Sequence, residues 1–241
     1  MKSFNPNANK LGGFSENDGT IDFYSRINCL INNDSEVLDF GAGRGAWSED
    51  EILFRKKTRN LKGKVKKVYA CDVDKAVYLN KNVDEILTME DGKVQAHGES
   101  MDIIIADYVL EHIENPKKFF NEIDRLLKPG GWFCARTPHK YNLISLFAML
   151  IKNNSHSFFL KYVQPDRKEI DIFPTYYRLN TLNKIKEIFK EYNDKSFIYR
   201  TDPAYYFGKK SIFYLQKILG TFLVDPLIGN LYIFKQKSPL S

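Results

Sequence analysis

The stretch Val37–Trp47, VLDFGAGRGAW, decides how the fold of this chain is read. An apolar run ends at Phe40, and three glycines follow at every second position, Gly41, Gly43 and Gly45. Apolar residues without alternation are typical of a strand buried on both faces of a parallel sheet. Bare glycines directly after such a strand let a ligand approach the main chain. The stretch therefore predicts a first strand followed by a ligand-binding loop.

Three later segments have the same form and predict further strands of one sheet. They are residues 65–74 (VKKVYACDVD), 101–112 (MDIIIADYVLEH) and 131–138 (GWFCARTP). Between the last two, Asn115 and Pro116 predict the start of a helix, which Pro129-Gly130-Gly131 ends. Alternating strands and helices indicate an α/β fold with a doubly wound, mostly parallel sheet of seven strands. Ligands of such sheets lie beyond the carboxyl ends of the strands.

The rest of the chain is expected to complete a single domain. A helix is predicted over residues 181–192, and residues 196–202 and 230–237 are predicted to pair as antiparallel strands at the edge of the sheet. We divide the domain into an N-terminal cover (1–34), a cofactor-binding core (35–139), a helical insertion over the ligand edge on the acceptor side (140–178), and closing helices and strands (179–241).

Composition limits the classes of protein and partner. The longest apolar run, residues 143–150, is too short to cross a bilayer, and no export signal is visible, so we expect a cytoplasmic protein. A peripheral contact with the inner face of a membrane is an alternative. The net charge of +6 is concentrated in residues 55–67, which we interpret as a solvated helix end because no aromatic residues are interleaved for nucleic-acid stacking. Three cysteines without metal-type spacing predict neither a disulfide nor a metal site, and we expect reduced, buried thiols.

The glycine loop does not have the spacing of a phosphate-binding loop. It reads G-x-G-x-G, and it lacks the G-x-G-x-x-G spacing of a dinucleotide site and the lysine of a P-loop. Asp39 would repel a pyrophosphate, but it suits the ammonium group of an amino acid. Asp72, at the end of the second predicted strand, can accept hydrogen bonds from both hydroxyls of a ribose. S-adenosylmethionine combines an amino acid end with a ribose and has no phosphate.

Four segments in order extend this interpretation: VLDFGAGRG, VYACDVD, MDIIIADYVLEHI and EIDRLLKPGGWFCARTP. Through them, residues 36–142 resemble the class I S-adenosylmethionine-dependent methyltransferases, in particular the type 11-like branch with a V-L-E-H segment. The resemblance implies a Rossmann-like methyltransferase fold with S-adenosylmethionine as cofactor, and an enzyme that transfers methyl groups.

The resemblance also assigns site residues. Asp39 and the three glycines would form the loop at the methionine end, and Asp72 would hold the ribose. Val73 would lie against adenine, with Glu90 as the acidic residue on the adenine side, although VQAHGESMD replaces the family's Leu-Pro-Phe stretch. Asp107 would line the methyl-donor pocket. Tyr24 or Arg26, in the N-terminal cover, would close over the cofactor.

The acceptor requires a separate argument. A base is needed only if the acceptor must lose a proton, and the candidates at the ligand edge are His112, Asp107, His139 and Tyr141. A packing role is the alternative for His112, and exposure to solvent for His139. The segments DIFPTYYRLNT and DPAYYFG are similar to methyltransferases of bacterial surface-glycan pathways. This similarity implies O-methylation of a sugar in a glycan or glycolipid precursor.

Other functions stay open at this point. The acceptor could be a quinone or another lipid-like ring, or an RNA base, although ADYV stands where base methyltransferases carry an Asn/Asp-Pro-Pro-Tyr-type pocket. A catalytically silent cofactor-binding scaffold is the alternative from another class. We expect a small-molecule or glycan acceptor and no nucleic-acid partner. Residues 213–223 (FYLQKILGTFL) predict an amphipathic helix that would suit a membrane surface, although we favour packing on its own domain.

Overall fold

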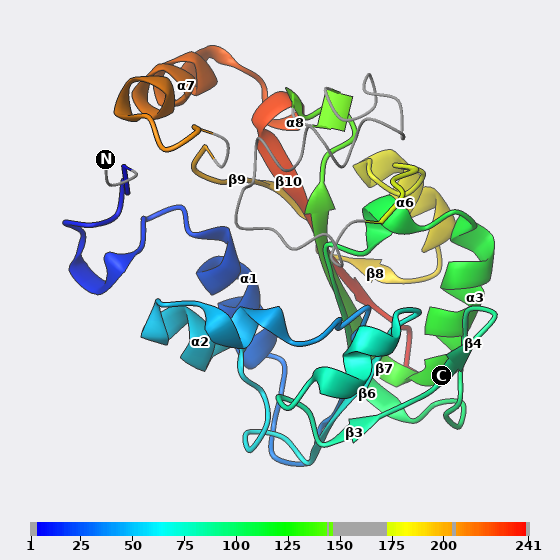
Figure 1. The fold of residues 1–241 in the computed structure, drawn as a ribbon. Coiled ribbons are helices and arrows are strands. Elements are labelled where there is room, and N and C mark those ends of the chain that lie inside the picture. Colours follow the sequence, from blue (N-terminus) through cyan, green and yellow to red (C-terminus); the bar gives the residue numbers. More distant parts are fainter. Residues whose placement is uncertain (1–3, 144, 147–172, 204–205, 240–241) are drawn as a thin grey trace.

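The computed structural model describes residues 4–143, 145–146, 173–203 and 206–239. Its centre is a sheet with the order β3-β2-β1-β6-β7-β10-β8, and β9 also pairs with β10 (Figure 1). The strands are β1 (Glu36–Phe40), β2 (Lys67–Cys71), β3 (Glu85–Ile86), β6 (Met101–Asp107), β7 (Leu127–Pro138), β8 (Asn193–Asp194), β9 (Phe197–Arg200) and β10 (Gly229–Gln236). Most of the predicted insertion, residues 147–172, lies outside the described residues.

The sheet confirms the predicted doubly wound, mostly parallel fold. Strands β3, β2, β1, β6 and β7 run parallel, whereas β10 runs antiparallel to β7, β8 and β9. Eight strands occupy seven positions because β8 and β9 both pair with β10. The predicted antiparallel pair is β9 with β10, and the reversed strand β10 lies one position in from the edge.

Helices cover both faces of the sheet, as Figure 1 shows. One face packs against α1 (Gly19–Asn28), through Phe23 and Ile27, with α2 (Leu53–Arg59) beside it. The other face packs against α3 (Pro116–Leu126) and α6 (Leu182–Ile188), through Ile123 and Ile185. The remaining elements are the 3-10 turns η1 (Leu11–Gly13), η2 (Ala46–Glu49), η3 (Lys75–Leu79) and η4 (Leu110–His112), the hairpin β4 (Met89–Glu90) and β5 (Lys93–Val94), and the helices α7 (Lys210–Phe222) and α8 (Asp225–Ile228).

The structure corrects the boundary between α3 and β7. Asn115 does cap α3 by accepting a hydrogen bond from the Lys118 N–H at 3.0 Å. The strand, however, already begins at Leu127, so the Pro-Gly-Gly sequence lies within β7. The register of β7 against β6 shifts there. Leu127 pairs with Met101, whereas Trp132, five residues later, pairs with Ile103, only two residues after Met101. Proline has no N–H to donate and Gly130 has a φ of +79°, so the chain bulges inside the strand instead of ending the helix.

Two expectations from composition are resolved. Cys71 and Cys134 are buried thiols, but Cys29 follows α1 and is exposed, so the expectation of three buried cysteines is wrong for that residue. Within the described ranges, no helix is long and apolar enough to cross a membrane.

Candidate functional site

The glycine loop after β1 has left-handed backbone at each of its three glycines. Gly41, Gly43 and Gly45 have φ values of +73°, +53° and +74°. A β-carbon on Gly41 would lie 2.5 Å from the Val109 side chain, and one on Gly45 would lie 2.4 Å from the Asn80 Oδ1. A β-carbon on Gly43, in contrast, would meet no atom within 4 Å. Two glycines are therefore required by packing, while the third leaves its surface open to a ligand.

Asp72 follows β2 and holds this loop in place. One carboxylate oxygen accepts the Gly43 N–H at 2.8 Å, and the other accepts the Asp74 N–H at 2.9 Å. The sequence analysis missed the loop's other supports, Asn80 and Asn82, whose amide nitrogens donate to the carbonyl oxygens of Gly43 and Gly45 at 3.3 and 3.1 Å. Asp72 and the open face of Gly43 thus lie together, as predicted.

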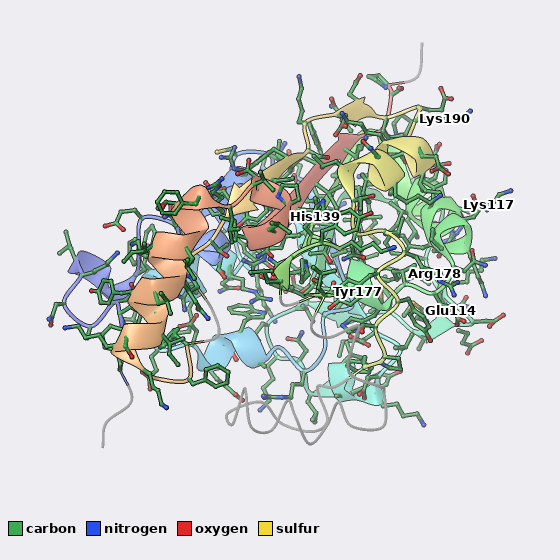
Figure 2. The ribbon with its side chains drawn as sticks, turned by 90° about the horizontal axis from the view of Figure 1, so that it is seen from above. Glu114, Lys117, His139, Tyr177, Arg178 and Lys190 are labelled. Carbon is green, nitrogen blue, oxygen red and sulfur yellow. The ribbon has the colours of Figure 1, made fainter. Side chains whose placement is uncertain are left out.

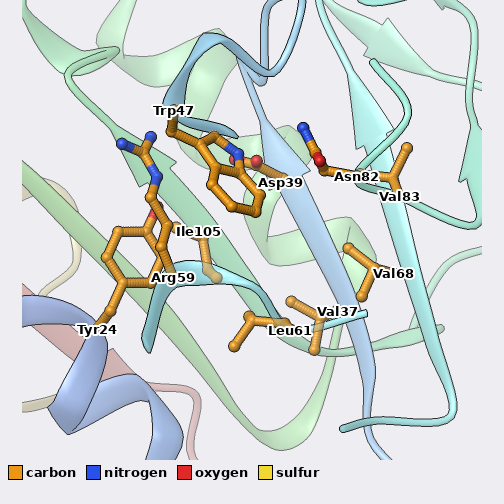
Figure 3. A pocket seen from close by; sticks show the side chains of 10 residues that line it. All are labelled: Tyr24, Val37, Asp39, Trp47, Arg59, Leu61, Val68, Asn82, Val83 and Ile105. Atoms are coloured by element: carbon orange, nitrogen blue, oxygen red, sulfur yellow. The ribbon is translucent and has the colours of Figure 1, made fainter. Parts of the chain in front are cut away.

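Asp39 lies on β1, two residues before the glycine loop, and lines a cavity of about 20 Å³. Figure 3 shows the indole of Trp47 beside Asp39, with Arg59 and Tyr24 on the neighbouring side. Burial raises the pKa of the Asp39 carboxyl to about 7, although the positive charge of Arg59 opposes the shift. The Arg59 guanidinium lies 5.2 Å from the centre of the Tyr24 ring, and its buried Nε–H has no hydrogen-bond partner among the described residues.

Asp107, at the end of β6, is the centre of a buried ion cluster. Arg136, its partner across to β7, donates through Nε and through Nη2 at 3.0 Å. The Nη2 of Arg59 lies 3.0 Å from the same carboxylate, and the Tyr24 hydroxyl donates to it at 3.1 Å. Burial alone would raise the pKa of Asp107, but the two guanidinium groups hold it below its ordinary value. An ionised carboxylate with three donors is poorly suited to be a general base, although Asp107 was one of the candidates.

Arg59 and Arg136 are site residues that the sequence analysis missed. Arg136 carried a signal, since a charge inside the apolar run WFCARTP must be paired when it is buried. Its side chain is 5% exposed. Arg59 belongs to the basic run 55–67 and has no such signal. Only the packing of α2 shows that it points towards Asp107 and not towards solvent.

His112 is held by the segment that begins at Phe173. Its Nδ1 lies 2.7 Å from the Pro174 carbonyl oxygen, and its ring lies against Phe173. The same segment is fixed through Tyr176, whose N–H donates to the Glu111 carbonyl at 2.7 Å, and through Arg178, which donates to the Glu114 carbonyl at 2.6 Å (Figure 2). A carbonyl oxygen only accepts, so Nδ1 carries the proton, and in the neutral form of the ring the lone pair is on Nε2.

His139, one of the candidate bases, is buried and is held by contacts with the backbone. Its side chain is buried next to α8 (Figure 2), and its Nδ1 accepts the Tyr141 N–H at 3.1 Å. Burial lowers its pKa, although a hydrogen bond with the backbone of Pro226 opposes the shift. Contacts with two backbone groups fix the ring, so His139 is a structural residue. Tyr141, in contrast, is exposed.

The remaining predicted residues differ in how close they lie to the glycine loop and the ion cluster. Val73 follows Asp72 directly and is 73% exposed, so its side chain is available to an adenine ring. Glu90 lies on the β4–β5 hairpin, outside the main sheet, and is exposed. Tyr24 reaches the ion cluster, but Arg26 pairs with Asp22 at 2.7 Å and lies over the Phe197 ring, so Arg26 does not close the site.

Comparison with known proteins identifies the family. A family model described as a methyltransferase domain matches residues 15–191. The chain belongs to the methyltransferase domain family. A search of curated proteins finds no match, whereas solved structures with a similar fold are numerous.

Three of these structures illustrate the similarity of this methyltransferase to known folds. A putative methyltransferase in complex with the Haloferax volcanii Trm112 activator is 14% identical with a TM-score of 0.57, over 93% of this chain and 94% of that chain. A putative sarcosine dimethylglycine methyltransferase from Galdieria sulphuraria is 14% identical (TM-score 0.54; 91% and 85% covered). A Methanosarcina mazei S-adenosylmethionine-dependent methyltransferase is 15% identical (TM-score 0.53; 89% and 98% covered).

The family and the fold make the chain a methyltransferase with a Rossmann-like, doubly wound sheet, and the Methanosarcina mazei protein of similar fold is described as S-adenosylmethionine-dependent. Two features of the site fit S-adenosylmethionine: the open face of Gly43 beside Asp72, and the unpartnered Nε–H of Arg59, a residue that lines the same cavity as Asp39. The cavity of about 20 Å³ beside Asp39 holds no more than one water.

Proposed function

We propose that the methyltransferase O-methylates a sugar hydroxyl of a bacterial surface glycan or glycolipid precursor, with His112 as the base. The contact between His112 Nδ1 and the Pro174 carbonyl supports this proposal most directly. It leaves the lone pair of the neutral ring on Nε2, which is the atom that would take the hydroxyl proton. A sugar hydroxyl needs such a base because its oxygen is a weak nucleophile while it is protonated.

In this proposal the cofactor's polar ends meet complementary groups. The Asp39 carboxylate accepts hydrogen bonds from the ammonium group of the cofactor's amino acid end. Arg59 donates hydrogen bonds to the carboxylate of that same end. Asp72 accepts the ribose hydroxyls, and Val73 lies against adenine, with Glu90 as an outer residue on that side. When bound, the cofactor supplies an activated methyl group. The protein positions the acceptor oxygen in line with it, removes the proton and excludes water.

The pairing of the basic run argues against an RNA acceptor. Arg55 pairs with Asp18 and Asp50, at 2.6 and 2.9 Å. Other members of the run pair with acidic side chains in the same way: Arg59 with Asp107, Lys62 with Asp84, Lys66 with Glu36 and Lys67 with Glu85. Cations that are neutralised within the protein contribute little to phosphate binding. A quinone or lipid-like acceptor stays the second candidate, because the exposed apolar helix α7 suits a lipid environment.

Transfer of a labelled methyl group into cell fractions tests the acceptor. The purified enzyme and labelled S-adenosylmethionine are incubated with separated glycan, lipid-linked sugar, quinone and RNA fractions. We expect label in the glycan or lipid-linked sugar fraction, in a form that glycosidase treatment releases as a methylated sugar. Label in the quinone or RNA fraction would replace the proposed acceptor, and no transfer to any fraction would favour the silent scaffold.

The open face of Gly43 gives a specific prediction. Gly43→Ala is expected to weaken binding of S-adenosylhomocysteine at least about tenfold, because the new methyl group would occupy space that the ligand needs. Gly63→Ala is a matched control, since Gly63 also has a positive φ (+81°) and open space around it. Both variants carry a similar backbone strain of about 1 kcal/mol. Equal binding by the two variants would remove Gly43 from the cofactor site.

The raised pKa of Asp39 predicts a pH dependence. An ammonium group binds the ionised carboxylate, and a carboxyl with a pKa of about 7 is much less ionised at pH 6 than at pH 7.5. The Kd of S-adenosylhomocysteine should therefore rise by about eightfold between pH 7.5 and pH 6. Asp39→Asn should bind weakly without this dependence. A raised folded-state pKa costs stability that grows as the pH rises from the ordinary carboxyl pKa to about 7 and is complete above that pH, so Asp39→Asn should raise the Tm more at pH 8 than at pH 5. A flat Kd profile in the unmodified enzyme would contradict this role.

A further inference from the structure

Tyr108 has a backbone conformation that is unfavourable for its side chain. It follows Asp107 at the carboxyl end of β6, and its φ is +59°. Bulky aromatic residues seldom adopt this left-handed conformation, and they keep it only where the surrounding structure enforces it. The turn is closed by a hydrogen bond that the Tyr108 N–H donates to the Arg136 carbonyl at 2.9 Å. A glycine or asparagine would fit this turn with less strain, so the fold alone does not account for an aromatic side chain here.

Two contacts hold the Tyr108 ring in one orientation. The Arg136 guanidinium lies over the ring, 4.9 Å from its centre. Asn230, near the start of β10, donates from its amide to the Tyr108 hydroxyl at 3.1 Å. Arg136 is itself fixed by its pair with Asp107, so the ring rests on the buried ion cluster. Tyr108 is nevertheless 41% exposed, so the ring is anchored while much of its surface is left to solvent.

The turn that carries this ring contacts the parts of the site that the reaction must bring together. Val109, the next residue, packs on the glycine loop, because a β-carbon on Gly41 would lie 2.5 Å from its side chain. The Val109 carbonyl accepts the His112 N–H at 2.9 Å, so one tight turn joins Tyr108 to the proposed base. Tyr108 therefore lies at the ligand edge of the sheet, on a turn that touches the donor loop and leads into His112.

The chemistry of an aromatic ring suits one face of a sugar. A pyranose carries hydroxyl groups around its rim and C–H groups on its faces. The hydrogens of these C–H groups carry partial positive charge because their carbons bear oxygens, whereas the face of an aromatic ring carries partial negative charge. Stacking therefore removes apolar surface from water and leaves the rim hydroxyls accessible. A rim hydroxyl is the group that a base such as His112 would deprotonate.

We propose that Tyr108 is an acceptor-binding residue, whose exposed ring stacks against the C–H face of the acceptor sugar. This inference rests on the proposed function. The anchored ring sets the plane of the sugar, and so determines which hydroxyl faces the methyl donor and His112. Tyr108 contributes binding and orientation, and His112 alone takes the proton. The strained backbone fits this role, because such strain concentrates at sites that contact ligands.

Acceptor saturation in two variants tests this role. Rates of labelled methyl transfer are measured at saturating S-adenosylmethionine against dilutions of the labelled sugar fraction, and the concentration that gives half the maximal rate is a relative KM. Tyr108→Leu keeps a bulky apolar side chain but removes the aromatic face, so it should raise this KM at least about tenfold. The kcat should fall less than about threefold, since the lost contact binds ground state and transition state alike. Tyr108→Phe keeps the ring and loses only the hydrogen bond with Asn230, so its KM should rise about two- to threefold.

Tyr69→Leu is the matched control. The Lys67 ammonium lies over the Tyr69 ring at the same distance, 4.9 Å, but Tyr69 lies in the middle of β2 and not at its carboxyl end. The KM of Tyr69→Leu should match that of the unmodified enzyme. Calorimetry should give both Tyr108 variants the unmodified Kd for S-adenosylhomocysteine, whereas a purely structural role would lower cofactor affinity and Tm together with acceptor binding.

The possible outcomes separate this inference from the proposed function. An unchanged KM in Tyr108→Leu, with label still entering the sugar fraction, would overturn the inference and leave the proposed function standing. Equal losses in Tyr108→Leu and Tyr69→Leu would also overturn it. Label in the quinone fraction would replace the proposed acceptor. A tenfold rise in KM for that fraction would then keep the stacking role of Tyr108, and no rise would exclude it. No transfer to any fraction would overturn both.

Discussion

Replacing Asp107 by Ala is expected to lower the free energy of unfolding by about 3–5 kcal/mol and to abolish cofactor binding. The Asp107 side chain is 3% exposed, and it is the shared partner of two guanidinium groups, those of Arg136 and Arg59. Without the carboxylate, Arg136 would be a buried charge without compensation, and the cost of burying that charge would fall on the folded state. Urea denaturation monitored by circular dichroism measures the change.

Two further variants show whether the loss comes from an unpaired charge. Glu187→Ala breaks an exposed pair with Lys184 and should cost less than about 1 kcal/mol. The double variant Asp107→Leu/Arg136→Met removes both partners of the buried pair and should be less destabilised than the sum of the two single changes. If Asp107→Ala costs no more than Glu187→Ala, the cluster does not hold β6, β7 and α2 together as described.

The second large effect is expected at His112. His112→Ala should lower kcat for the sugar acceptor by about 10²–10⁴-fold, because the hydroxyl proton would have no positioned acceptor. The Kd of S-adenosylhomocysteine should stay unchanged, since His112 is not among the residues proposed to hold the cofactor. Initial rates of labelled methyl transfer at saturating cofactor, together with calorimetry, measure both quantities.

His112 also contacts Pro174, so a structural role must be separated from a chemical one. Added imidazole should restore part of the activity of His112→Ala if the missing group is a base. It should not restore activity if the loss comes from a shift of the segment that contains Pro174. His97→Ala changes an exposed histidine on a loop and serves as the control. Unchanged kcat in His112→Ala would exclude the base, whereas a loss without imidazole rescue would make His112 a positioning residue.

The motifs that depend on local sequence were predictable. Three glycines after an apolar run predicted a buried strand followed by a bare loop, and the structure places such a loop directly after β1, with a positive φ at Gly41, Gly43 and Gly45. Asp72 at the next strand end had to reach the same loop, because carboxyl ends of adjacent parallel strands share one edge. The alternation of strands and helices likewise specified the doubly wound sheet.

What depends on packing could not be predicted in the same way. From the sequence, Arg59 resembled the other cations of a surface run. Only the packing of α2 beside α1 directs its side chain towards Asp107. His139 looked accessible at a strand end, but α8, distant in sequence, covers it. The Pro-Gly-Gly sequence after α3 resembled a helix end, yet pairing with β6 begins before it. Each of these errors comes from a contact between segments that are far apart along the chain.

Calorimetric titration with S-adenosylhomocysteine tests the central claim most directly. The unmodified enzyme should bind one equivalent, and Asp72→Ala should bind about 10- to 100-fold more weakly through loss of charge-assisted hydrogen bonds to the ribose. Asp74→Ala, a change two residues further along the same loop, should bind like the unmodified enzyme. Absence of binding by the unmodified enzyme, or equal affinity in Asp72→Ala, would contradict the account.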